Sequence, residues 1–255
     1  MYNGINIYQV IDMKLLKKVI PYLIIIMIVT GVVFVGADTE KNSAIHSVSK
    51  TLPVIIIDAG HGGIDGGAVA ADGTTEKDIN LDIALKMNAY LGNLGYETVL
   101  TRSDDESIHS EDAQTTRQKK VSDLHNRLEI IKLNPDSIFI SVHQNYYTQS
   151  KYSGAQVFFS ENNPQSSVLA QCIQDSIVSS IQPDNTRKIK QNSTSIFLLS
   201  NSTVPSVMVE CGFLSNTAET EKLKNEDYRM QMAEAICKGI INYINGKEIE
   251  SAVND

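Results

Sequence analysis

A glycine-rich stretch directly after an apolar run constrains the fold of this chain most. Residues 52–57 are rich in β-branched side chains and are typical of a buried strand. Five glycines then fall within positions 60–67, where they allow left-handed or crowded backbone conformations. In open α/β sheets, ligands bind outside the carboxyl ends of the strands, so we expect His61 beside such a crevice. By itself the stretch is compatible with a metal site and with an ordinary glycine turn that contains a histidine.

Strand and helix patterns alternate along the rest of the chain. Apolar residues recur at helical spacing between positions 79 and 94, and residues 96–101 alternate as a second strand, so the two form a βαβ unit with parallel strands. Further strands are predicted at 137–142, 155–160, 196–199 and 206–209, and further helices at 121–131, 168–181 and 232–243. This alternation predicts a single α/β domain with a twisted, mostly parallel central sheet flanked by helices.

The N-terminal residues have the pattern of an export signal. Three lysines between positions 14 and 18 precede the uncharged, largely apolar residues 19–37. The length of this run suits a membrane span, whereas its small residues at 35–37 suit a cleavage site, so a signal peptide and an uncleaved anchor are both open. The lysines place the following chain outside the cytoplasmic membrane. We therefore predict a signal peptide or anchor at 1–37, a linker at 38–51, a catalytic domain at 52–246 and a tail at 247–255.

Charge and cysteine content exclude some classes of protein. The net charge of −8 argues against nucleic acid as a partner. The three cysteines are scattered and odd in number, so they indicate no disulfide framework.

Three acidic or imidazole side chains take equivalent places after strands, and a fourth lies at the start of a helix nearby. His61 follows the first strand, His143 follows the strand at 137–142, and Glu210 follows the strand at 206–209. Glu76 lies in the first turn of the first helix. If these strands are neighbours, the four side chains converge on one crevice. Two imidazoles and a carboxylate with an open position form the ligand set of a hydrolytic zinc site, and a second carboxylate can act as its base.

Each of these residues also has an ordinary interpretation. His143 suits a strand end, Glu76 suits the positive end of a helix dipole, and Glu210 suits a salt bridge. Glu210 fits the ordinary interpretation least, because an apolar strand leads directly into it and a carboxylate there needs a partner. The remaining histidines, at positions 46, 109 and 125, have no comparable placement and are expected at the surface.

Four motifs in order resemble the zinc-dependent N-acetylmuramoyl-L-alanine amidases of the amidase-3 family. They are Asp58-Ala59-Gly60-His61-Gly62-Gly63, Thr75-Glu76-Lys77-Asp78-Ile79-Asn80, Ser141-Val142-His143-Gln144-Asn145 and Val209-Glu210-Cys211-Gly212-Phe213-Leu214-Ser215-Asn216. The resemblance implies that His61, Glu76 and His143 hold the zinc and that Glu210 is the catalytic glutamate. Gln144 and Cys211 depart from the family's usual residues, but neither stands at a ligand position.

A shorter likeness links the chain to the spore-cortex, germination-specific branch of this family, through Ser153-Gly154-Ala155-Gln156 and Thr186-Arg187-Lys188. The resemblance implies hydrolysis of the amide between N-acetylmuramic acid and L-alanine in peptidoglycan, as the first step toward muramic δ-lactam. It further implies an exported or membrane-anchored enzyme, with the forespore intermembrane space as one candidate location. The partners it implies are an accessory protein and a downstream deacetylase.

Two other functions remain open at this point. A zinc exopeptidase on a similar α/β scaffold would need a pocket for a terminal carboxylate or amine, and no residue in the sequence indicates such a pocket. A non-catalytic, membrane-anchored cell-wall-binding protein would tolerate a decayed site, whereas His61, Glu76, His143 and Glu210 are all present.

Overall fold

The computed structural model describes residues 52–192 and 196–254. The predicted signal or anchor at 1–37 and the predicted linker at 38–51 therefore lie outside the described residues. Within the described ranges, none of the helices combines the length and hydrophobicity that a membrane crossing requires.

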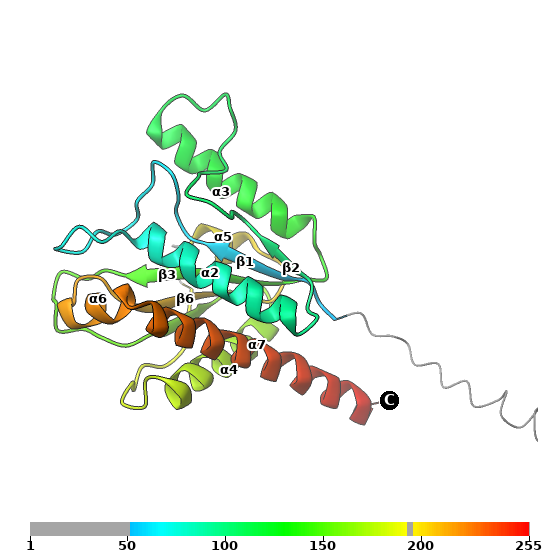
Figure 1. Cartoon of the computed structure of the whole chain (residues 1–255). Helices are drawn as coiled ribbons and strands as arrows, with labels where there is room; N and C mark the ends of the chain where they lie inside the picture. The colour runs from blue at the N-terminus through cyan, green and yellow to red at the C-terminus, as the bar shows by residue number, and fades with distance from the viewer. Residues whose placement is uncertain (1–51, 193–195, 255) are drawn as a thin grey trace, which may run out of the picture. The chain divides into compact units, whose positions relative to one another are not determined.

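A central sheet of six strands is formed by the described residues, in the order β2-β1-β3-β6-β4-β5 (Figure 1). All neighbouring strands in it are parallel except β4 and β6, which run antiparallel. The strands are β1 Ile55–Ala59, β2 Thr98–Leu100, β3 Ile138–Asn145, β4 Gln156–Phe159, β5 Lys190–Gln191 and β6 Ser206–Phe213. The prediction of a single α/β domain with a mostly parallel sheet is confirmed.

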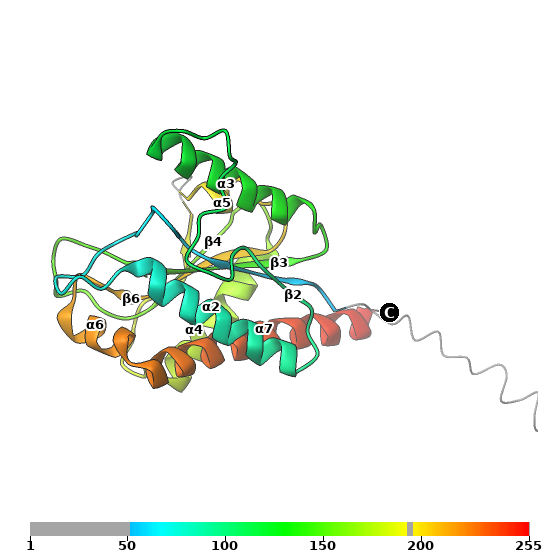
Figure 2. The ribbon, with the colours of Figure 1, turned by 45° about the horizontal axis from the view of Figure 1, so that its top comes forward.

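Helices cover both faces of the sheet, as Figures 1 and 2 show. On one face lie α2 Glu76–Asn93, α4 Gln165–Ser180 and α7 Glu226–Asn254, and on the other lie α3 Thr116–Lys132 and α5 Phe197–Asn201. Because strand side chains alternate between faces, Ile55 and Ile57 join the larger core under α2, whereas Ile56 joins the smaller core under α3. A further helix, α6 Thr217–Lys224, follows β6.

The predicted strand at 196–199 is wrong, because Phe197–Asn201 form the short helix α5. A short apolar run cannot be assigned to strand or helix by periodicity alone. Here the Asn192 side chain accepts a hydrogen bond from the Ile196 amide and donates one to Ser200 Oγ at 2.8 Å, and these bonds fix a helical turn.

Two strands extend further than their apolar residues indicate. β3 continues to Asn145 and β6 continues to Phe213, so His143 and Glu210 lie inside strands rather than after them. Helix α3 likewise begins five residues before the predicted start, because Thr115 and Gln118 form a capping box ahead of a polar first turn. Helix α7 runs to Asn254, past position 246.

A buried ion pair joins α3 to the end of β1. The guanidinium of Arg127 donates to Asp58 Oδ1, and both side chains are only 2% exposed. Asp58 also accepts from the Thr101 and Ser141 hydroxyls, at 2.8 and 2.5 Å. Burial alone would raise the pKa of Asp58, but the charge of Arg127 and these donors outweigh it and lower the pKa. Asp58 is therefore a buried carboxylate that depends on its partner.

Replacing Arg127 by methionine should destabilise the domain by about 3–5 kcal/mol at pH 7, because it leaves the Asp58 carboxylate buried without a counter-charge. Urea unfolding measures this loss. The stabilisation should be present above the unfolded carboxyl pKa of about 3.9 and should disappear as the pH falls. The matched control is Lys132→Met on the same helix, which removes an exposed ion pair with Glu129 and should barely move the urea midpoint. A similar midpoint for both variants would contradict the expectation.

Candidate metal centre

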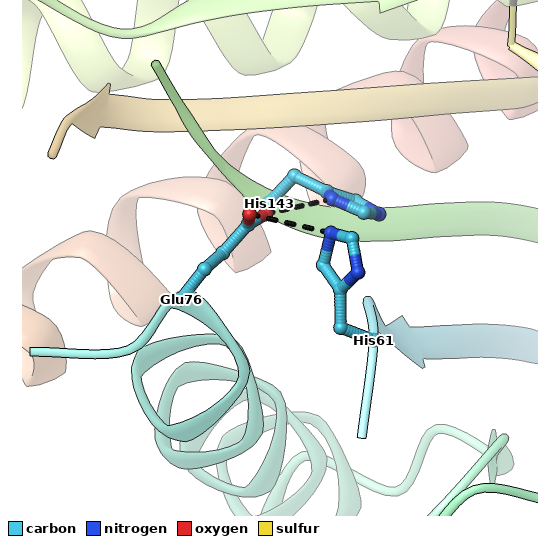
Figure 3. Close-up of side chains that lie close together, drawn as sticks. All are labelled: His61, Glu76 and His143. Atoms are coloured by element: carbon cyan, nitrogen blue, oxygen red, sulfur yellow. Dashed lines mark hydrogen bonds and ion pairs between the residues drawn. The ribbon is translucent and has the colours of Figure 1, made fainter. Parts of the chain in front are cut away.

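Three of the predicted site residues meet at the carboxyl ends of β1 and β3 (Figure 3). His61 lies in the loop after β1, His143 lies on β3, and Glu76 begins α2. The carboxylate of Glu76 lies between the two imidazoles, with His61 Nε2 3.2 Å from its Oε2 and His143 Nδ1 2.9 Å from its Oε1. One donor atom from each of the three residues lies within 4.8 Å of the other two. The structure thus brings together the three residues predicted as metal ligands.

Two glycines make room for this cluster. A Cβ atom at Gly60 would lie 2.2 Å from His143 Nε2, and one at Gly67 would lie 2.5 Å from Glu76 Oε2. Gly67 also has a φ of +67°. His61 itself has a φ of +64°, and among the described residues no other non-glycine residue has a positive φ. A left-handed histidine is strained, and such strain persists where the surroundings hold it in place.

Gly60→Ala should abolish metal binding and activity, because the new methyl group would overlap the His143 ring. A displacement of about 1 Å at a reacting centre can lower the rate by about 10²-fold. Gly66→Ala is the matched control, since a Cβ there meets no atom within 4 Å. Zinc content and turnover, measured for both variants, test this expectation. Full zinc occupancy in Gly60→Ala would show that the backbone can move away.

Two arginines hold the backbone of this loop from behind. Arg102 donates from Nε to the carbonyl of Ala59 at 2.9 Å and from Nη2 to that of Gly60 at 3.2 Å. Arg127 donates to the carbonyls of Ala59 and His61, at 2.8 and 2.7 Å. The carbonyl bond from Arg127 helps to hold His61 in its left-handed conformation. Sequence patterns assigned no role to either arginine, because the loop carbonyls that they hold lie more than forty residues away along the chain.

Glu76 is held by backbone amides as well as by the histidines. Its carboxylate accepts from the amides of Ala68 and Gln144, at 2.8 and 3.0 Å, and from Asn80 Nδ2 at 3.3 Å. Burial alone would raise the pKa of Glu76, but the hydrogen bonds with His143 and His61 outweigh it and lower the pKa. Its side chain is therefore ionised and held in one orientation. An interaction with the helix dipole alone, the ordinary interpretation of Glu76, would not need these contacts.

A second carboxylate, Asp65, lies behind His61 and was not predicted. Its Oδ2 is 2.9 Å from His61 Nδ1, and its Oδ1 pairs with Lys120 Nζ at 2.7 Å. Burial lowers the pKa of His61, but hydrogen bonds to Asp65 and Glu76 outweigh it and raise the pKa to about 9. A carboxylate on one ring nitrogen fixes the tautomer and directs the other nitrogen to a metal. The spacing His61-x-x-x-Asp65 was visible in the sequence, but the loop geometry that joins them was not.

Glu210 lies on the strand beside His143 and is aligned with it. The two residues are register partners of the parallel strands β3 and β6, so their side chains emerge on the same face of the sheet. Glu210 is not one of the three clustered donors among the described residues. Its Oε2 is buried and accepts no hydrogen bond from the described part of the chain. Burial raises its pKa to about 7, and its interaction with Glu76 adds to this, against the lowering effect of His143. These properties suit a general base, which needs a free carboxylate oxygen to accept a proton.

The other histidines lie away from this cluster. His125 is exposed on α3, where its ring is 5.0 Å from that of Phe197. His109 was expected at the surface but is half-buried, with its Nδ1 3.0 Å from Ser107 Oγ. His46 lies outside the described residues.

The chemistry of the donor set fits a divalent metal. Two imidazoles and one carboxylate, with further positions open, are the usual protein ligands of catalytic zinc. The carboxylates of Asp65 and Glu76 beside His61 favour positive charge at this site, and they raise the pKa of His61 against the effect of its burial. A metal ion binds only the neutral imidazole, so its binding must release any proton on His61.

Known proteins resemble this chain along the stretch that carries all four residues. A family model described as N-acetylmuramoyl-L-alanine amidase matches residues 55–242. A germination-specific N-acetylmuramoyl-L-alanine amidase of Bacillus subtilis is 34% identical over 194 residues, which cover 76% of this chain and 81% of that protein. The amidase AmiA of Escherichia coli is 28% identical over 234 residues, which cover 75% of this chain and 76% of that protein. The solved structure of the CwlD amidase from Clostridioides difficile in complex with the GerS lipoprotein is 44% identical, with a TM-score of 0.73, and covers 76% of this chain and 98% of that one.

Proposed function

Since this chain belongs to the amidase-3 family, whose members are metal-dependent N-acetylmuramoyl-L-alanine amidases, we propose that it hydrolyses peptidoglycan with zinc as its cofactor. His61, Glu76 and His143 are the proposed ligands. The observation that carries this proposal is the approach of their three donor atoms to within 4.8 Å of one another. The bond cleaved is the amide between the lactyl group of N-acetylmuramic acid and the L-alanine of the stem peptide.

Each residue of the site has a role in this mechanism. Zinc held by His61, Glu76 and His143 would supply a Lewis acid that polarises the scissile carbonyl and lowers the pKa of water. Glu210 accepts the proton of the attacking water and passes it to the leaving amine. The free Oε2 of Glu210 supports this role, because no described protein donor competes for it. Asp65 keeps the proton of His61 on Nδ1, so that Nε2 remains available as a ligand.

The cellular role that we propose is maturation of the spore cortex. It is supported by the similarity to a germination-specific amidase and to the CwlD amidase. Removal of the peptide would be the first step toward muramic δ-lactam, and a deacetylase would complete the ring. An accessory protein is part of the proposal, because the CwlD amidase was solved with the GerS lipoprotein.

Export completes the proposal, because peptidoglycan lies outside the cytoplasmic membrane. Residues 1–37 would direct export as a signal peptide or anchor, residues 38–51 would be a linker, and residues 52–246 would be the catalytic domain. A reporter enzyme that works only in the cytoplasm, fused after Asp255, should stay inactive. Activity of that reporter would contradict export.

Mass spectrometry of digested peptidoglycan tests the reaction itself. The zinc-loaded protein should release intact stem peptides with a free L-alanine amine and leave muramic acid residues that carry no peptide. Release of single amino acids from the peptide ends would instead indicate an exopeptidase. Binding to the wall without any cleavage would indicate the non-catalytic alternative.

A further inference from the structure

Arg187 lies beside Glu210 but has no part in the mechanism described above. Its Nη2 donates to Gln156 Oε1 at 2.5 Å, and Gln156 is the register partner of Glu210 on the adjacent strand β4. Its guanidinium carbon lies 4.9 Å from the centre of the Phe213 ring, three residues after Glu210. The charge of Arg187 also lowers the pKa of Glu210. These contacts place a cation at the edge of the proposed reaction centre.

The guanidinium has donors that the protein does not use. In the described part of the chain, Gln156 Oε1 is the only acceptor for this side chain, and Nε is buried without a hydrogen bond. The nearby Glu219 does not pair with it, because its carboxylate accepts from the amides of Gly154 and Phe213 at 2.9–3.0 Å. A buried donor such as this Nε costs free energy until an acceptor from a ligand or from water completes it.

Arg187 also lines a cavity of about 420 Å³ between the segment 181–187 and the start of α6. Lys222, Ser153 and Asn185 also line this cavity. This volume falls within the range of about 300–1,000 Å³ that small-molecule sites occupy. The cavity is therefore large enough for part of a peptide, and its lining combines the cations Arg187 and Lys222 with the carboxylates of Asp184 and Glu219.

We propose that Arg187 is a specificity-determining residue that binds a free carboxylate of the stem peptide, with the cavity as the subsite for the residues beyond L-alanine. This inference rests on the proposed function. Before cleavage, the lactyl carboxyl of the glycan is engaged in the scissile amide, so the free carboxylates of the substrate lie on its peptide. The planar fork of arginine matches a carboxylate with two parallel hydrogen bonds. Because the chain has a net charge of −8, an acidic peptide needs such a local cation to bind.

The test compares two muropeptides that differ only in their peptide carboxylates, which are free in one and converted to amides in the other. For the wild-type enzyme, amidation should lower kcat/KM by about 10–100-fold, since a hydrogen bond to a charged group is lost. Arg187→Gln should lower kcat/KM by a similar factor on the free acid, mainly through KM, and should no longer distinguish the two substrates. Calorimetry with the released peptide, which is not turned over, should show that Arg187→Gln binds it more weakly than the wild type by a similar factor.

Lys190→Gln is the matched control, because it removes a cation three residues away that also lies over a phenylalanine, at 5.6 Å from the Phe158 ring. It should keep the wild-type preference. An unchanged preference for the free acid in Arg187→Gln would overturn the proposal, as would an equal loss on both substrates. If Arg187→Gln does not fold, Arg187→Lys decides, since it keeps the charge without the fork and should show a reduced preference. If the wild type cleaves both muropeptides at equal rates, the role of Arg187 is refuted but the proposed function stands. If it cleaves neither, the proposed function itself is refuted.

Discussion

Glu210→Gln should fold, retain its zinc and lose about 10²–10⁴-fold in kcat, the usual contribution of a general acid–base group. At 1.36 kcal/mol per decade this is about 3–5 kcal/mol of barrier. The amide keeps the shape of the side chain on β6 but cannot accept the proton of the attacking water. Binding of the muropeptide should change little, because the three clustered donors and the cavity beside Arg187 remain. Single-turnover kinetics, zinc analysis and calorimetry together measure these properties.

Two outcomes would overturn the assignment of Glu210. Loss of zinc in Glu210→Gln would make Glu210 a ligand and Glu76 the candidate base. Near-normal turnover with zinc retained would place the proton shuttle elsewhere. Glu221→Gln, which removes an exposed carboxylate from α6, is the control and should keep full activity.

The raised pKa of Glu210 also has a consequence for stability. Burial raises this pKa to about 7, above the value of about 4.3 for an unfolded glutamate, so the native state holds the proton more tightly. The metal-free wild type should therefore lose stability as the pH rises from about 4 to 7. Glu210→Gln should be more stable than the wild type at pH 8 and similar to it at pH 4, as urea midpoints would show.

Removal of one imidazole should remove the metal. His61→Ala and His143→Ala each leave two protein ligands of three, and we expect neither variant to retain zinc after dialysis or to have measurable activity. Glu76→Ala should weaken zinc binding strongly, because its carboxylate contacts both imidazoles. Asp65→Asn should have a smaller effect, about 10–100-fold in zinc affinity, as is typical when a partner behind a ligand is lost. Elemental analysis of the dialysed proteins ranks the variants directly.

His125→Ala is the control for this series, since it removes an exposed histidine from α3 and should keep one zinc per domain. Full zinc occupancy in His143→Ala would show that the cluster is not the metal site. An Asp65→Asn protein with less zinc than His143→Ala would contradict these assignments. It would indicate that Asp65 binds the metal directly and that His143 does not.

Much of the fold could be predicted from the sequence, because burial imposes local patterns. The β-branched run at 52–57 predicted the first strand, and alternating strand and helix patterns predicted an α/β domain with a mostly parallel sheet. Where polar residues continue an element, the pattern ended too early: β3 and β6 run on through His143 and Glu210. At residues 196–199 the apolar run had no period of its own, and the helical turn found there is accompanied by hydrogen bonds between the Asn192 side chain and Ile196 and Ser200.

The sequence by itself determined which residues could form the site, because His61, His143 and Glu210 follow apolar strand patterns, Glu76 begins a helical one, and their motifs resemble those of a known family. Only the tertiary structure decided how they meet. The left-handed φ of His61, the contact of Gly60 with the His143 ring and the carboxylate of Asp65 behind His61 all arise from the path of the loop. The roles of Arg127 and Arg187 depend on side chains that reach elements distant in the chain. Periodicity reports only whether a position is buried, whereas these contacts are set by the packing of whole elements against one another.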